Sequence, residues 1–124
     1  MKPSNKETAV QFLQMVVSGK IDEAYQIYVD MSGKHHNAFF PAGFAALKDA
    51  MKESEKETPN KKLTVNLVIG DGDLVAVHSH LERASNEPDI SVVHMFRFIN
   101  GKIVEMWDCG QVLPEECLNS DGVF

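Results

Sequence analysis

The chain has 124 residues, of which 44% are hydrophobic and 24% charged, as is typical of one globular domain with an adequate core. Its formal net charge is −6 and its cationic side chains are scattered. We therefore expect no nucleic-acid partner, because phosphate binding needs a clustered basic surface. No apolar stretch approaches the roughly 20 residues that cross a bilayer, and residues 1–6 lead into an amphipathic pattern without an apolar signal region. A cytoplasmic protein without a membrane partner is expected, with Cys109 and Cys117 as reduced thiols.

Three amphipathic helices are predicted in the first half of the chain. Ser4 and Glu7 have the spacing of a capping box at the start of the first helix, and Gly19 supplies its stop. A second helix follows directly, and a third is predicted over residues 44–57. Between them, residues 31–43 follow neither a helical nor a strand period, and they contain two His, one Asn and two Phe.

The second half of the chain predicts a sheet, because the hydrophobic period changes to two. Residues 85–89 read as a loop, and Asn100–Gly101 is a strong hairpin signal. The strands are predicted at residues 62–69, 74–83, 90–99 and 102–111, with 112–124 as a C-terminal tail.

Helices followed by hairpin-linked strands predict an α+β fold and not a doubly wound parallel sheet. We expect one domain over residues 1–124. It should be a cone-shaped roll in which three N-terminal helices pack on a strongly curved antiparallel sheet, and the mouth of such a cone is a natural ligand site.

Two stretches carry a resemblance to a known family. His36-Asn37 resembles the QHN stretch, and residues 96–108, FRFINGKIVEMWD, resemble the FRFENGKIVEHWD stretch, of a branch often described as predicted aldol-condensation enzymes. Over most of residues 5–113, the chain resembles the SnoaL-like proteins of the nuclear transport factor 2-like superfamily. These proteins are relatives of polyketide cyclases and ketosteroid isomerases.

The resemblance implies a deep pocket between the concave face of the sheet and the helices. Enzymatic members use a carboxylate or a His–Asp pair to move a proton on an enolisable carbonyl compound, with no metal or organic cofactor. Many members are dimers through the outer face of the sheet. Cyclase-type relatives often carry an acidic residue where this chain has Gln111, so the usual general acid/base is expected to be missing here.

The candidate catalytic residues are His78, His80 and Asp108. The two His share a face of one predicted strand and are general-base candidates because imidazole titrates near neutrality; alternatively, that face meets water or a dimer partner. Asp108 either orients a His or bonds to backbone at the rim. His94 is expected to be a satisfied sheet histidine. We expect no bound metal, because no carboxylate follows the His pair at a convincing spacing.

The candidate ligand-binding residues are His36, Asn37, Phe40, Trp107 and Gln111. The first two either hydrogen-bond a ligand at the pocket mouth or cap the neighbouring helix. The Phe, like Phe39 and Phe44, is expected to shape the core and the entrance, and the Trp to pack while walling the pocket for a flat ligand. Asn37 or Gln111 could stabilise an enolate oxygen.

Two functional hypotheses follow. The first is a cofactor-free lyase or isomerase with aldol-type or proton-transfer chemistry on a small apolar carbonyl compound. The second is a non-catalytic small-ligand-binding or dimerisation module. If the His78/His80 face lines the pocket, the sheet presents an apolar outer face that a second copy would bury, and a homodimer is expected. This outer set comprises Val75, Val77, Leu81, Val93, Met95 and Ile99.

Overall fold

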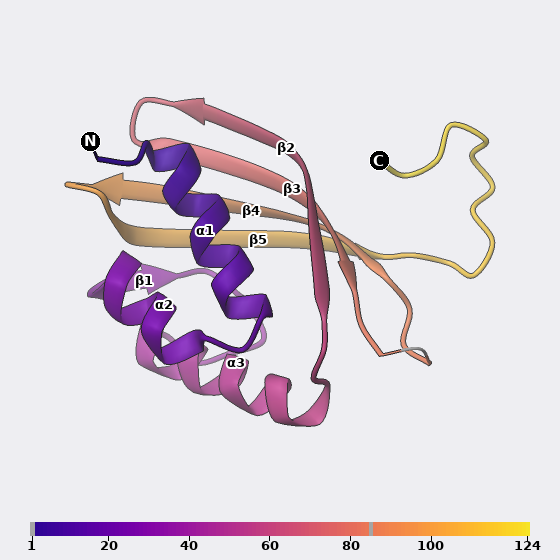
Figure 1. The fold of residues 1–124 in the computed structure, drawn as a ribbon, viewed down its shortest axis with the longest axis horizontal. Helices are drawn as coiled ribbons and strands as arrows, with labels where there is room; N and C mark the ends of the chain where they lie inside the picture. The colour runs from indigo at the N-terminus through magenta and orange to yellow at the C-terminus, as the bar shows by residue number, and fades with distance from the viewer. Residues whose placement is uncertain (1, 85) are drawn as a thin grey trace.

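The structure is a computed structural model that describes residues 2–84 and 86–124. The helices are α1 (Asn5–Val17), α2 (Ile21–Tyr28) and α3 (Phe44–Glu57), and the strands are β1 (Val29–His35), β2 (Lys62–Asp71), β3 (Leu74–Glu82), β4 (Ile90–Ile99) and β5 (Lys102–Val112). The sheet order is β1-β5-β4-β3-β2, and the helices cover one face of the sheet (Figure 1).

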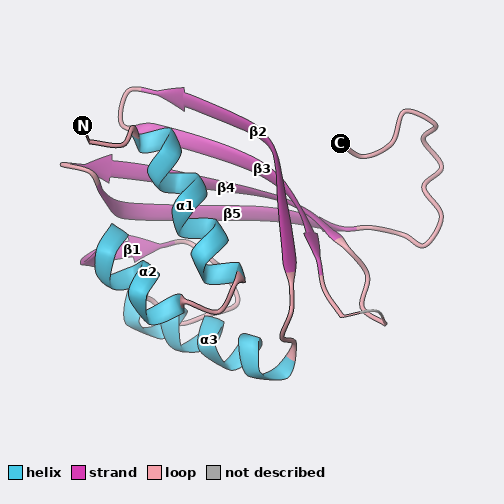
Figure 2. Cartoon of the chain, in the orientation of Figure 1, coloured by secondary structure: helices cyan, strands magenta, loops and turns pink. Residues whose placement is uncertain are grey.

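The α+β fold with three helices on a curled, open sheet confirms the predicted class (Figure 2). The expectation of a purely antiparallel sheet is wrong, because β1 adds a fifth strand that pairs with β5 in parallel. Sequence patterning missed β1 because most of its side chains are exposed and the strand shows no period-two alternation.

Several local signals act as predicted. The Ser4 side chain accepts from the Glu7 backbone at 3.1 Å, and the Glu7 carboxylate accepts from the Ser4 backbone at 3.0 Å. The hairpin residues Asn100 and Gly101 have φ values of 51° and 79°, as a two-residue hairpin turn requires. The predicted loop at 85–89 includes Ser85, which lies outside the described residues.

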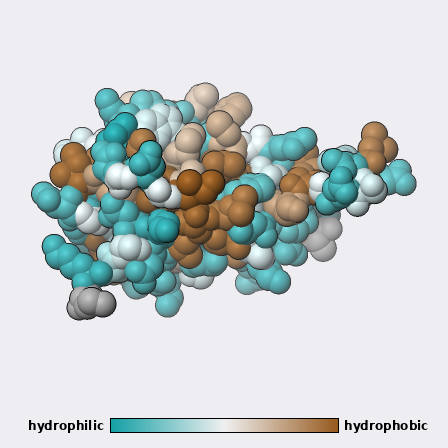
Figure 3. All heavy atoms as spheres, turned by 90° about the horizontal axis from the view of Figure 1, so that it is seen from above, coloured by the Kyte–Doolittle hydropathy of each residue, from teal (hydrophilic) through white to brown (hydrophobic). Residues whose placement is uncertain are grey.

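Apolar side chains are distributed between the core and the surface. Seen from above the molecule of Figure 1, hydrophobic atoms form a band across the middle (Figure 3). Leu67 and Ile69 of β2 are 57% and 64% exposed.

No described helix is both long and apolar enough to cross a membrane.

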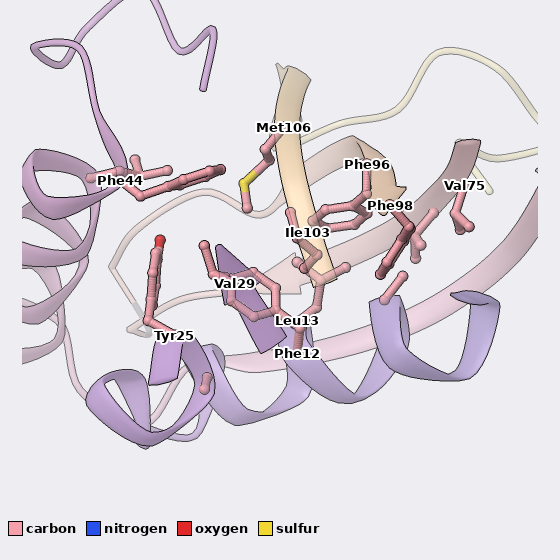
Figure 4. Close-up of a cluster of buried hydrophobic side chains, with 14 of the residues drawn as sticks. Phe12, Leu13, Tyr25, Val29, Phe44, Val75, Phe96, Phe98, Ile103 and Met106 are labelled. Atoms are coloured by element: carbon pink, nitrogen blue, oxygen red, sulfur yellow. The ribbon is translucent and has the colours of Figure 1, made fainter. Parts of the chain in front are cut away.

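The core lies between the helices and one face of the sheet. Phe12 of α1 meets the rings of Tyr25 and Phe96 edge-on, with ring centroids 5.3 and 5.9 Å apart (Figure 4). Tyr25 also meets Phe44 of α3 in this way. Burying each such side chain contributes about 1.5–3 kcal/mol, which fixes the helices over the sheet.

Alternation along β3 decides which side chains face the helices. Val75 and Val77 are 2% and 0% exposed and belong to the core, so His78 and His80 lie on the opposite, outer face. The expectation that the His face lines the pocket is therefore wrong. The physical reason is that the more apolar face of a strand is buried beneath the helices.

The outer face consequently differs from the predicted set. Val75, Val77 and Leu81 pack on the helix side, whereas the β4 residues Val93 and Met95 do face outward, opposite Cys109 and Trp107 of β5.

A one-residue β-bulge interrupts the β4–β5 ladder. Phe98 pairs with Ile103 and Arg97 pairs with Glu105, so Val104 is the additional residue. The bulge shifts the alternation of β5, because two residues of one strand then face one residue of its neighbour. Ile103 and Met106 both point into the core as a result.

Gly33 of β1 makes room for this bulge. A Cβ atom at Gly33 would lie 2.2 Å from the carbonyl oxygen of Val104 and 2.9 Å from Cε2 of Phe44. Backbone atoms cannot rotate out of such a contact, so β1 can approach β5 here only with glycine.

We predict that Gly33→Ala destabilises the protein by at least the roughly 1–3 kcal/mol typical of overpacking, because β1 must move away from β5. Urea unfolding of both proteins measures the change. Gly110→Ala is the matched control, since its nearest neighbour, 3.3 Å away, is a side-chain methyl of Ile90 that can shift. Equal stability of Gly33→Ala and the parent would contradict the proposed close approach.

Candidate functional site

A cavity of about 540 Å³ lies between the C-terminal halves of α1 and α3 and the adjoining ends of β2 to β5. Most of its wall is apolar, which suits a ligand that is itself largely apolar. The apolar lining includes Leu13, Val16, Met51, Leu63, Leu81 and Val92.

Three of the polar side chains in this wall come from segments far apart in the sequence. Asn37 comes from the loop after β1, His94 from β4 and Asp108 from β5. The same three also line an adjoining, smaller chamber of about 60 Å³, so they belong to the walls of both spaces. His94 and Asp108 are directly opposite each other in the β4–β5 ladder.

The carboxylate of Asp108 is held by the side-chain amide of Asn37. Asn37 Nδ2 donates to Oδ1 and Oδ2 of Asp108 at 3.1 and 3.0 Å. The Asn37 Oδ1 accepts from the backbone N–H of Phe39 at 2.9 Å, and this second bond fixes the amide orientation. The carboxylate therefore has a defined position in a mostly apolar wall.

His35, buried at the end of β1, holds the loop that carries Asn37. Its Nδ1 accepts from the backbone N–H of Asn37 at 3.1 Å, so its Nε2 carries the proton that is donated to the carbonyl of Pro41 at 2.8 Å. Both ring nitrogens of a neutral imidazole are thereby used. His35 therefore fixes the backbone of the loop that carries Asn37.

His94 lies beside Asp108 and is only partly exposed. Burial lowers its pKa, and the negative charge of Asp108 opposes that shift only in part. Its Nδ1 is buried without a hydrogen-bond partner among the described residues, which leaves Nε2 as the nitrogen available to a ligand. His94 is therefore a neutral imidazole at neutral pH.

Charged side chains stand at the outer end of the cavity. Lys61 and Arg83 both line it, and the Lys61 ammonium is 3.4 Å from the carboxylate of Glu55. The guanidinium of Arg83 donates to the carbonyl of Pro88 at 2.9 Å. These groups give the mouth a polar rim around an apolar interior.

Of the predicted catalytic residues, the structure places Asp108 in the cavity and the two histidines outside it. On the outer face of β3, His78 Nε2 is 2.9 Å from the Ser91 hydroxyl, and His80 Nε2 is 2.8 Å from the Asp89 carboxylate. The ring of Phe124 stacks over both, with centroids 5.5 and 4.5 Å away.

The predicted ligand-binding residues divide in the same way. Asn37 and His36 line the cavity, His36 at its rim. Trp107 and Gln111 lie on the outer side of β5, so the expectation that they meet a pocket ligand is wrong. Phe40 packs against the core, as expected, and its neighbour Phe39, 90% exposed, lines the cavity.

His36 connects the rim to the outer face. It donates to the Glu105 carboxylate at 2.6 Å and stacks on Trp107, with centroids 5.3 Å apart. The hydrogen bond from His36, together with one from Arg97, lowers the pKa of Glu105. Trp107 thus supports the loop that carries Asn37 from the far side of the sheet.

Sequence reasoning assigned His94 a purely structural role and left the face of Asp108 open. The useful signal was the strand alternation itself. Val92, Phe96 and Phe98 share the face of His94 and are among the most buried residues of the chain. A histidine in such a row faces the helices. In residues 2–84 and 86–124, no three His, Cys, Asp or Glu side chains gather as metal ligands.

The lowered pKa of His94 makes stability depend on pH. Between its ordinary value of about 6.5 and its lower folded value, the unfolded chain binds a proton that the folded chain does not. This contribution is complete above pH 6.5 and is lost as the pH falls. We predict that the parent protein loses more stability between about pH 7.5 and about pH 5.5 than His94→Gln does, measured by urea unfolding. Equal losses in the two proteins would contradict a buried, neutral His94.

Comparisons with known proteins agree with this architecture. The family model of the SnoaL-like polyketide cyclases matches residues 7–116. No curated protein matches the chain.

Solved structures share the fold at low sequence identity. IdmH of Streptomyces antibioticus, a candidate polyketide cyclase, is 19% identical with a TM-score of 0.74, over 87% of this chain and 92% of that one. A SnoaL-like polyketide cyclase of Agrobacterium tumefaciens is 13% identical with a TM-score of 0.73, over 89% and 93%. AclR of Streptomyces galilaeus, a candidate hydroxylase, is 21% identical with a TM-score of 0.66, over 87% and 91%. The family model covers most of the chain, and the chain belongs to the SnoaL-like polyketide cyclase family.

Proposed function

We propose that the protein is a cyclase- or isomerase-type enzyme that moves a proton on a small, largely apolar carbonyl compound. The observation that carries this proposal is the Asp108 carboxylate, fixed by Asn37 in the wall of an apolar cavity. A carboxylate in such surroundings is a general base with a defined direction of attack. The family of polyketide cyclases and the candidate cyclase among the neighbours support the same reaction class.

Asp108 is the proposed proton carrier. Its carboxylate would remove a proton from the carbon next to the substrate carbonyl, forming an enolate, and would return the proton at another atom or after formation of a carbon–carbon bond. Asn37 keeps both carboxylate oxygens in place during the exchange. Pre-positioning of this kind lowers the entropic part of the barrier.

His94 is the proposed partner for the enolate oxygen. A neutral imidazole can donate one hydrogen bond from Nε2 to an oxygen that gains negative charge, and the lowered pKa of His94 keeps it neutral. With the base and the donor on neighbouring strands, the reacting carbon and the carbonyl oxygen would face adjacent side chains.

The test is solvent-deuterium exchange into a panel of enolisable ketones and aldehydes. We expect Asp108→Asn, which keeps the shape of the side chain, to lower the exchange rate by about 10²–10⁴-fold. The matched control is His80→Ala on the outer face, which should retain the parental rate. Loss of exchange in His80→Ala with full activity in Asp108→Asn would refute the assignment.

The non-catalytic alternative predicts a different pattern in the same panel. A binding module would retain compounds tightly in the cavity without any exchange of their protons. Calorimetric titration of the compounds that bind, followed by the exchange measurement, therefore separates the two functions.

We further propose a homodimer formed through the outer face of the sheet. Two cross-strand rows on this face are largely apolar, and Leu67 and Ile69 at their β2 end are more than half exposed. A second copy packed sheet on sheet would bury both rows. The rows are Leu67, His78, Val93 and Cys109, and Ile69, Ala76, Met95 and Trp107.

Sedimentation should therefore give about twice the chain mass of 13.8 kDa. We expect Met95→Lys, at the centre of the outer face, to produce monomers, because burying an unpaired charge is costly. Lys2→Met, a change at an exposed position before the first helix, is the control. A parent protein that sediments as a monomer would contradict the proposal.

A further inference from the structure

The smaller chamber beside Asp108 has a polar group that the proposed mechanism does not use. Tyr25 of α2 is 2% exposed, yet it lines this chamber together with Asn37, His94 and Asp108. Its ring is fixed edge-on between those of Phe12 and Phe44, and its oxygen points toward the space between Phe44 and Met106 (Figure 4). Met106 also lines the chamber.

The Tyr25 hydroxyl makes no hydrogen bond to another described residue. Burial alone raises the pKa of its phenol, with no contribution from a hydrogen-bonding neighbour. The Tyr25 oxygen is not among the fully buried side-chain atoms that lack a partner, so it meets the open space of the chamber. Phenolic hydroxyls in protein interiors usually find an acceptor, so this one calls for a partner inside the chamber.

The chamber has room and polarity for water. Its volume of about 60 Å³ compares with about 30 Å³ per molecule in liquid water. A buried water needs two to four polar contacts, and the wall offers the phenolic O–H as a donor and the Asp108 carboxylate as an acceptor. Asn37 provides Asp108 with only two donated bonds, and two carboxylate oxygens can accept about four.

We propose that one or two ordered water molecules occupy the inner chamber, bound between the Tyr25 hydroxyl and the Asp108 carboxylate. This water contacts Asp108 from the smaller chamber and not from the large cavity. When an apolar ligand fills that cavity and displaces its solvent, the carboxylate keeps a hydrated side. Tyr25 is then a positioning residue that acts on Asp108 through water.

The role in turnover rests on the proposed function, but the water site itself does not. The chamber is formed by the protein alone, so the water can be sought in the ligand-free state. Failure of the catalytic proposal would leave the structural and thermal results unchanged.

The primary test is Tyr25→Phe, which removes the hydroxyl and keeps the ring. We expect high-resolution crystal structures to show water between Tyr25 Oη and Asp108 in the parent, and its displacement or loss in the variant. We also expect a lower melting temperature, because the variant loses a hydrogen bond to bound water. A dry chamber predicts the opposite sign, since Tyr25→Phe then removes an unsatisfied hydroxyl and raises the melting temperature.

The chain's other tyrosine provides the matched control. Tyr28 lies on the same helix, is half-buried and packs at the edge of the core, so Tyr28→Phe should leave the chamber water in place. In the deuterium-exchange assay, Tyr25→Phe should lower kcat with little change in KM, because the water contacts Asp108 and not the ligand. Absence of ordered water in the parent, or a raised melting temperature in Tyr25→Phe, would overturn the proposal.

Discussion

The arrangement of the site depends on one backbone contact, the approach of Gly33 in β1 to the bulged residue Val104 in β5. Without the bulge, the ladder that starts at Ile99 and Lys102 would place Trp107 opposite His94. With it, Asp108 occupies that position. A single additional residue therefore exchanges a large aromatic side chain for a carboxylate on the wall of the cavity, and glycine on the neighbouring strand makes the exchange possible.

The same contact places the loop that completes the site. Because β1 pairs with β5 in parallel, its last residue, His35, lies beside Met106, and the loop that follows brings Asn37 to its hydrogen bonds with Asp108. His35 itself holds the backbone of Asn37, which lies only two residues beyond this end of the strand. On the other side of the sheet, the stacking of Trp107 on His36 supports the same loop. Residues on both faces of the sheet therefore help to hold the Asp108 carboxylate in position.

The sequence was a good guide wherever local chemistry decides the structure. The Ser4–Glu7 capping box, α3 and the Asn100–Gly101 hairpin all depend on neighbouring residues, and each formed as predicted. The faces of the strands depend on tertiary packing instead. Alternation correctly separated His78 and His80 from Val75 and Val77, but only the helices determine which set is covered. A pocket assignment made from the polar residues alone therefore selected the wrong side of β3.

This error has a general physical cause that also explains why Asp108 was the harder residue to place. The alternation of faces in one strand predicts that of the next only while the pairing register across the hairpin is unbroken. The bulge at Val104 breaks this register, and the sequence does not reveal it because valine is common in regular strands. The apolar row Val92, Phe96 and Phe98 does mark the covered face of β4, and His94 lies in it. Identifying the covered face from the most apolar row, and only then looking for polar residues within it, would have led to His94. Asp108, which pairs with His94 beyond the bulge, could be placed only by recognising that Gly33 makes room for one additional residue in β5.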